Sequence, residues 1–304
     1  PLEPRMSDMT KDATPITIIH RFIPTNGVRL HVAEAGPQDG PLVVLLHGFP
    51  EFWYGWRRQI PALAAAGFHV VAPDQRGYNL SDKPAKVQDY ATQILAADVV
   101  GLFDACGADR ALLVGHDWGG GVAWTVAEQH PERLRALAVL NCPHGQAFQE
   151  VLRRSPRQAL RSWYMAAFQI PWLPEKLLGA RGARRLGRAM RGTARRGTFS
   201  REDMARYQEA WLQPGALTAM INWYRAGLRY PPPKSPVAIE PPTLLIWGEQ
   251  DTALGMEFIE PICRPCADIR VERLPGASHW VQHEEPDAVN ALLVEFLDGF
   301  TCTE

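Results

Sequence analysis

Four continuous apolar runs, separated by segments with helical patterns, constrain the fold of this chain most strongly. A strand that leaves one face in water alternates apolar and polar residues, whereas these runs are apolar almost throughout. Continuous apolar strands are typical of a parallel sheet covered by helices on both faces, so we expect an α/β fold with a mostly parallel sheet. The runs are residues 41–46, 68–72, 111–114 and 134–140.

Weaker patterns before and after these runs predict the remaining elements. A turn at Asn26-Gly27 joins two β-rich segments and predicts a hairpin. Further strands are expected at 16–22, 28–35, 241–247 and 269–274. Pro61 fits the first position of a helix. Helices are expected at 61–66, 91–105, 121–130 and 286–300.

The middle of the chain differs in character from the segments around it. It is rich in arginine, tryptophan and tyrosine, has no clear strand, and shows amphipathic helical patterns at 158–168 and 200–211. We therefore expect a helical cap domain of residues 143–237 that covers the substrate. The α/β core domain would then comprise residues 14–142 and 238–304, and residues 1–13 would be an N-terminal extension or a tag remnant.

Charge and composition argue against several kinds of partner. The net charge is −1, so no overall field attracts nucleic acid or anionic membranes. No apolar run approaches the ~20 residues of a membrane helix, and the first residues lack the apolar core of a signal peptide. Five scattered cysteines suit a reducing compartment. We therefore expect a cytoplasmic protein with no nucleic-acid partner and no integral membrane segment.

Asp117 is the candidate nucleophile. It lies between the apolar run 111–114 and a helical segment, with Gly115 and Gly119 two positions away on either side. The G-x-S-x-G turn presents a nucleophile in this way, and here aspartate replaces serine. A carboxylate needs no base to deprotonate it and can attack an sp3 carbon directly to form an alkyl ester. Epoxides and alkyl halides both offer such carbons.

Two further polar residues follow strands in the order that this chemistry requires. Asp251 follows the strand at 241–247, and His279 follows the strand at 269–274. The carboxyl edge of an open α/β sheet is where sites lie, and the order nucleophile, acid, histidine suits such a sheet. We expect His279 to act as the base and Asp251 to orient its ring.

The loop His47-Gly48-Phe49-Pro50, after the first apolar run, supplies a candidate oxyanion hole. We expect the backbone N–H groups of Phe49 and Trp118 to form it. The His47 side chain is expected only to brace this loop. No compact cluster with metal-ligand spacing is present, so a metal is not indicated.

On these residues the chain resembles the epoxide hydrolases of the α/β-hydrolase superfamily, from about residue 16 to residue 300. Two segments of the insert are similar to those that carry the catalytic tyrosines of that family, Ser-Trp-Tyr-Met-Ala-Ala-Phe-Gln-Ile-Pro at 162–171 and Asn-Trp-Tyr-Arg at 222–225. The resemblance implies the α/β-hydrolase fold and makes Tyr164 and Tyr224 the ring-opening pair. Phenols with a pKa near ~10 stay protonated at neutral pH and can donate to the epoxide oxygen. Composition alone would place both tyrosines in an aromatic core.

The reaction implied by the resemblance is the hydrolysis of an ether bond, the conversion of an epoxide to a vicinal diol, with a role in detoxification. Asp117 attacks a ring carbon while Tyr164 and Tyr224 hold the oxygen, and His279-activated water then hydrolyses the ester. No cofactor is needed, and we expect a small apolar epoxide as substrate. Besides the catalytic rings, the side chains expected to bind it are Pro50, Trp53, Phe168, Trp223 and Trp280.

Three alternatives remain for the function. Haloalkane dehalogenases are similar in Asp117-Trp118, but they commonly carry asparagine where Phe49 stands. Haloacetate dehalogenases carry arginine directly after the nucleophile, where this chain has Trp118. A ligand receptor on the same scaffold that has lost turnover is less favoured, because Asp117, Asp251 and His279 are all present.

Eight arginines crowd residues 181–201. Such a charged stretch is expected to be a solvated face of the cap, and attraction of anionic substrates or membrane surfaces is the alternative. The arginines are Arg181, Arg184, Arg185, Arg188, Arg191, Arg195, Arg196 and Arg201.

Overall fold

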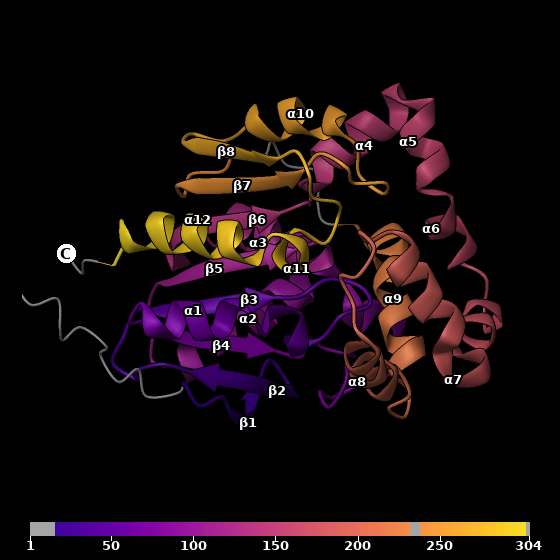
Figure 1. The fold of residues 1–304 in the computed structure, drawn as a ribbon, viewed down its shortest axis with the longest axis horizontal. Helices are drawn as coiled ribbons and strands as arrows, with labels where there is room; N and C mark the ends of the chain where they lie inside the picture. Colours follow the sequence, from indigo (N-terminus) through magenta and orange to yellow (C-terminus); the bar gives the residue numbers. More distant parts are fainter. Residues whose placement is uncertain (1–15, 232–237, 302–304) are drawn as a thin grey trace, which may run out of the picture.

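An eight-stranded sheet runs through the computed structural model, which describes residues 16–231 and 238–301 (Figure 1). Its strand order is β1-β2-β4-β3-β5-β6-β7-β8. β2 pairs antiparallel with β1 and β4, and all other neighbours are parallel, so the predicted mostly parallel sheet is confirmed. The strands are β1 Ile19–Thr25, β2 Val28–Ala35, β3 Leu42–Leu46, β4 His69–Pro73, β5 Ala111–His116, β6 Leu134–Leu140, β7 Thr243–Gly248 and β8 Ile269–Leu274.

Helices cover both faces of this sheet, as the apolar strands predicted. Figure 1 shows α1 and α12 in front of the sheet and α2 and α3 behind it. Successive strand residues enter different cores: Val43 packs with α1 and α12, whereas Val44 packs with α2 and α3. Each fully buried valine or leucine contributes roughly 1.5–3 kcal/mol. The helices are α1 Gln59–Ala65, α2 Thr92–Ala105, α3 Trp118–Gln129, α10 Ile259–Cys263, α11 Val281–Glu284 and α12 Pro286–Asp298.

Two helix starts differ from the sequence-based expectation. α3 begins at Trp118 rather than at residue 121, because packing against β3 and β5 overrides the poor helix propensity of its glycines. Pro61 is the third residue of α1, not the first. Proline is tolerated there because the first-turn N–H groups of a helix have no intrahelical partner.

The insert is helical in the part that the structure describes. The pattern at 158–168 is divided between two short helices, and α8 begins with a capping box between Ser200 and Asp203. α7 is broken at 180–183, where the backbone leaves the helical region. The insert helices are α4 Gly145–Arg154, α5 Pro156–Arg161, α6 Trp163–Ala167, α7 Leu173–Gly192, α8 Arg201–Trp211 and α9 Ala216–Arg229.

The division into a core domain and a cap domain stays a prediction, and residues 1–13 lie outside the described residues. The described helices include none that is both long and apolar enough to cross a membrane. Short 3-10 helices complete the chain: η1 Trp53–Trp56, η2 Val87–Tyr90, η3 Pro131–Arg133 and η4 Met256–Phe258.

The helices α6–α9 gather beyond one end of the strands (Figure 1). Two indole groups tie them to the loops that follow β3 and β4. The Trp211 Nε1–H donates to the carbonyl of Pro50 at 2.5 Å, and the Trp223 Nε1–H donates to the carbonyl of Arg76 at 3.0 Å. The helical insert therefore packs on the carboxyl edge of the sheet, where the polar residues of the predicted site lie.

Candidate active site

Asp117 occupies a tight turn between β5 and α3. Its backbone has φ 49° and ψ −125°, in a region that L-residues rarely adopt. The two flanking glycines permit this turn. A Cβ on Gly115 would lie 2.5 Å from the carbonyl oxygen of Gly119, and a Cβ on Gly119 would lie 2.2 Å from that of Leu46. The turn therefore needs glycine at both positions, and it projects Asp117 from the sheet edge.

The loop after β3 closes over the Asp117 carboxylate. The Phe49 N–H donates to Asp117 Oδ1 at 2.7 Å. Gly48 allows this approach, because a Cβ there would lie 2.4 Å from Asp117 Cβ. His47 holds the loop through Nδ1, 3.0 Å from the Gly48 carbonyl, and through Nε2, which accepts the Gln75 N–H at 3.1 Å. Trp118, the other predicted amide donor, is the first residue of α3.

His279 lies between the two predicted carboxylates. Its Nδ1 is 2.7 Å from Asp251 Oδ2, and its Nε2 is 3.5 Å from Asp117 Oδ2. Because a carboxylate only accepts, Nδ1 carries a proton and Nε2 faces the nucleophile. Asp251 also accepts from the N–H groups of Ala253 and Leu254 and from Asn141 Nδ2, at 2.7–2.9 Å. These bonds fix the orientation of the acid and hence of the ring.

The three charges stabilise one another in this buried position. Burial opposes the charge of His279, but the carboxylates of Asp251 and Asp117 raise its pKa well above the ordinary value. Burial likewise opposes the charge of Asp117, yet its hydrogen bond to His279, the charges of His279 and His116, and the Phe49 amide lower its pKa. The pKa of Asp251 is lowered mainly by His279, against burial. The free site therefore holds two carboxylates and an imidazolium.

Tyr164 and Tyr224 meet above this triad. Their ring centroids are 5.8 Å apart, and Tyr224 also packs on Trp118, Phe49 and Phe168 at 5.0, 5.1 and 4.9 Å. Burial, then the Asp117 charge, raises the pKa of Tyr164, while burial, Tyr164 and Asp117 raise the pKa of Tyr224. Both phenols therefore keep their protons and remain hydrogen-bond donors.

The other residues expected to line the pocket differ in how closely they lie to Asp117 and His279. Phe168 packs against Tyr224, and the Trp280 ring lies edge-on to His279 at 5.2 Å. Trp223 is fully buried and packs against Trp118 at 5.9 Å. Pro50 is buried and bound through its carbonyl by Trp211, as described above.

The Trp53 side chain does not join the aromatic rings around Asp117 and His279. Within the part of the chain that the structure describes, its ring contacts are His20, Phe52 and Tyr54. Its backbone N–H donates to Asp74 Oδ1 at 3.0 Å. η1 thus turns the Trp53 side chain toward the β1–β2 hairpin instead of toward Asp117.

A buried polar network around Glu51 was not anticipated from the sequence. The fully buried Glu51 carboxylate accepts from the Tyr207 hydroxyl at 2.7 Å and from Gln282 Nε2 at 3.0 Å, and its oxygens lie 2.7 Å from His283 Nε2 and 3.1 Å from His116 Nδ1. Its only sequence signal is an acid directly after the His47–Pro50 loop. Burial opposes its charge, but His283 and His116 hold the pKa of Glu51 well below the ordinary value.

The network reaches His279 through the backbone. His116 Nε2 lies 2.8 Å from the His279 carbonyl, which only accepts, so this nitrogen carries the proton. On the other side, Arg57 Nη1 donates to His283 Nδ1 at 3.0 Å, which leaves the His283 proton on Nε2 facing Glu51. Glu51 therefore connects α8, α11 and the His279 backbone. Across residues 16–231 and 238–301, no group of three His, Cys, Asp or Glu side chains is arranged to hold a metal ion.

Comparisons with known proteins agree on the relationship. A family model described as alpha/beta hydrolase fold matches residues 41–286. The Bacillus subtilis AB hydrolase superfamily protein YfhM is 46% identical, covering 91% of this chain and 97% of its own. Epoxide hydrolase A of Mycobacterium tuberculosis is 37% identical, covering 92% and 97%. The crystal structure of epoxide hydrolase A from Mycobacterium thermoresistibile superposes with a TM-score of 0.82 at 34% identity, covering 94% and 100%.

The chain belongs to the epoxide hydrolases of the α/β-hydrolase family. The resemblance inferred from the sequence and the predicted fold class are therefore confirmed. Within this hydrolase, the strand-end residues Asp117, Asp251 and His279 lie together at the edge of the sheet, and Tyr164 and Tyr224 approach them from α6 and α9.

Proposed function

We propose that this hydrolase converts an epoxide to a vicinal diol through an alkyl ester on Asp117. The observation that carries the proposal is the position of the Asp117 carboxylate. Its Oδ1 accepts the Phe49 amide, its Oδ2 faces His279, and two protonated phenols lie nearby. Oδ2 is therefore the attacking atom, and Oδ1 is held for the later oxyanion.

In the first step, Oδ2 attacks a ring carbon and the carbon–oxygen bond of the epoxide breaks. The leaving oxygen takes a proton from Tyr164 or Tyr224, and the other phenol donates a hydrogen bond to it. General acid catalysis of this kind contributes about 10²–10⁴-fold. The product of this step is a hydroxyalkyl ester of Asp117.

In the second step, water hydrolyses that ester. Esterification removes the negative charge of Asp117, one of the causes that hold the pKa of His279 high. His279 can then give up its proton, which restores the tyrosinate of the first step to a phenol, and accept one from water at Nε2. The hydroxide attacks the ester carbonyl, and the amides of Phe49 and Trp118 stabilise the oxyanion at Oδ1. The diol leaves as an alkoxide that takes the proton of the newly formed Asp117 carboxylic acid. One water is added overall, and each protein group returns to its starting state.

The aromatic cluster favours apolar epoxides, and we retain the cytoplasm and a role in detoxification as parts of the proposal. A haloalkane or haloacetate dehalogenase would use the same nucleophile and is the second candidate. Haloalkane dehalogenases commonly carry asparagine where Phe49 stands, and haloacetate dehalogenases carry arginine where Trp118 stands. The two phenols can protonate an epoxide oxygen, which an alkyl halide does not have. A ligand receptor without turnover would not need the charged residues Asp117, Asp251 and His279.

A paired assay tests the proposal. The purified protein is given aryl and alkyl epoxides, with diol as the readout, and haloalkanes and fluoroacetate, with free halide as the readout. We expect diol without halide, and loss of diol in Asp117→Ala. Halide without diol would establish the dehalogenase alternative, and turnover that survives in Asp117→Ala would refute the nucleophile.

A further inference from the structure

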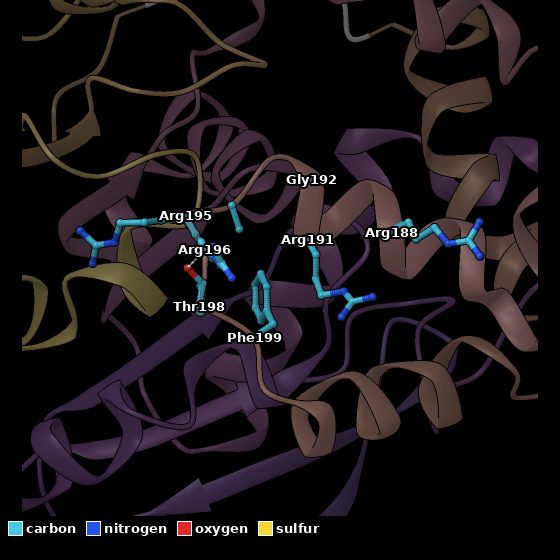
Figure 2. Close-up of a pocket in the computed structure, with 9 residues that line it drawn as sticks. Arg188, Arg191, Gly192, Arg195, Arg196, Thr198 and Phe199 are labelled. Atoms are coloured by element: carbon cyan, nitrogen blue, oxygen red, sulfur yellow. Dashed lines mark hydrogen bonds between the residues drawn. The ribbon is translucent and has the colours of Figure 1, made fainter.

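A cavity of about 400 Å³ lies outside the candidate active site, where α7 ends and the chain continues to α8. Arg188, Arg191, Arg195 and Arg196 line it together with Phe199, and no acidic residue is among its lining (Figure 2). In this view the side chains of Arg191 and Arg196 lie on either side of the Phe199 ring.

The charge of this cavity is only partly neutralised. Arg195 pairs with Glu285 at 2.6 Å, and its backbone N–H donates to Glu284 Oε1 at 2.6 Å. Within the described residues, Arg188, Arg191 and Arg196 have no ion pair with a carboxylate. The C-terminal end of α7 adds about half a negative charge here, which is small against three unpaired guanidinium groups.

We propose that this cavity binds an oxyanion group, a carboxylate or a phosphate. Guanidinium groups present paired N–H donors that match the oxygens of both groups, and charge-assisted bonds of this type are about twice as strong as neutral ones. The residues that carry the site are Arg191 and Arg196, with Arg188 adding charge along α7. The site does not depend on the ring-opening chemistry.

The cavity is linked to the catalytic histidine by packed side chains. Phe199 packs edge-on against Trp280 at 5.5 Å, and Trp280 packs edge-on against His279 at 5.2 Å. Thr193, between the cavity residues Gly192 and Ala194, accepts the Trp280 Nε1–H at 3.1 Å. The Phe199 and Trp280 rings therefore lie in sequence between the cavity and His279.

Binding of inorganic phosphate, followed by titration calorimetry at about 20 mM ionic strength to limit screening, tests the site. The test variant is Arg191→Gln/Arg196→Gln. The control is Arg184→Gln/Arg185→Gln, which removes the same charge from exposed positions of α7 that do not line the cavity. We expect one saturable site, a Kd raised about tenfold or more in the test variant, and a change below about twofold in the control.

A second arm distinguishes the source of the oxyanion. Co-sedimentation with phosphatidylglycerol vesicles, lost in the test variant and kept in the control, would identify a lipid headgroup as a ligand. Phosphate binding without co-sedimentation would identify a free oxyanion. Equal weakening in both variants, or no binding of phosphate or vesicles by the wild-type protein, would overturn the proposal.

Discussion

The Asp117 carboxylate is one of two negative charges that act on the histidine facing it. Asp251 and Asp117 raise the pKa of His279 well above its ordinary value, although burial alone would lower it. A protonated His279 stabilises the nucleophile but is not a base. Ester formation neutralises Asp117 and leaves Asp251 as the nearest negative charge. The pKa of His279 then falls, and the deprotonated ring can act as a base. In the proposed mechanism, the facing atoms Asp117 Oδ2 and His279 Nε2 therefore act in successive steps, the first as nucleophile and the second as base.

Asp117→Asn is expected to lower the pKa of His279. A neutral amide keeps the shape of the ester-like state but no longer favours the imidazolium form, so the proton leaves at a lower pH. NMR titration of the His279 ring measures this change. Glu150→Gln, a substitution of an acid far from the site in α4, is the control and should leave the His279 titration unchanged. An unaltered His279 pKa in Asp117→Asn would contradict the electrostatic account.

Removal of either phenol hydroxyl should slow ring opening. Tyr164→Phe and Tyr224→Phe keep the aromatic packing but lose one donor to the leaving oxygen, so we expect single-turnover ester formation to fall about 10²-fold in each. Tyr230→Phe, at an exposed ring beyond α9, is the matched control. Rates within about twofold of wild type in both variants would return the tyrosines to a packing role.

At the scale of elements, the nucleophile turn depends on how closely α3 approaches β3. Gly119→Ala would place a methyl group against backbone oxygens of Leu46 and His47, at 2.2 and 2.5 Å. We expect a loss of about 1–3 kcal/mol in the free energy of unfolding. Gly121→Ala, in the same helix, meets nothing closer than 4.0 Å and should be neutral or stabilising, because alanine favours a helix by roughly 1 kcal/mol. Urea unfolding measures both, and equal effects would contradict the geometry.

Substitution of Glu51 should destabilise the protein more than substitution of any one of its hydrogen-bond partners. In Glu51→Gln the new amide NH2 would face either the donors of Tyr207 and His283, now at Oε1, or the donor of Gln282, now at Oε2, so buried donors lose their acceptor in either orientation. A buried unsatisfied group costs about 1–3 kcal/mol, whereas Tyr207→Phe removes one hydrogen bond worth about 1 kcal/mol. Urea unfolding should therefore rank Glu51→Gln as the more destabilised. The reverse order would show that Glu51 is not the centre of the network.

The sequence indicates the sheet and the triad for the same physical reason. Parallel strands bring their carboxyl ends to one edge, so Asp117, Asp251 and His279 could be expected to meet although Asp117 lies more than a hundred residues from Asp251 and His279. Three insert helices, α4, α7 and α9, were not anticipated, although their residues form distinct apolar and polar helical faces that the sequence already contains. The Glu51 network, the orientation of Trp53 and the arginine cavity depend on side chains that distant segments bring together. Residue patterns along the chain carry little information about such contacts.

At the scale of the whole molecule, the insert and the sheet edge form one functional unit. In the proposed mechanism, residues at the sheet edge supply the nucleophile, the base and the oxyanion hole, and α6 and α9 supply the phenols. Hydrogen bonds from Trp211 and Trp223 to the loops after β3 and β4 connect the helical insert to the sheet edge. The proposed chemistry therefore requires that both parts pack together, and its central feature is a covalent ester on Asp117.

Mass spectrometry of the His279→Gln variant after mixing with styrene oxide tests that feature most directly. Without the base, the ester should form but not be hydrolysed, so the protein should gain the mass of one substrate molecule on the peptide that contains Asp117. The double variant Asp117→Asn/His279→Gln should gain nothing. An unmodified His279→Gln protein that still produces diol, or an adduct on another residue, would contradict the mechanism.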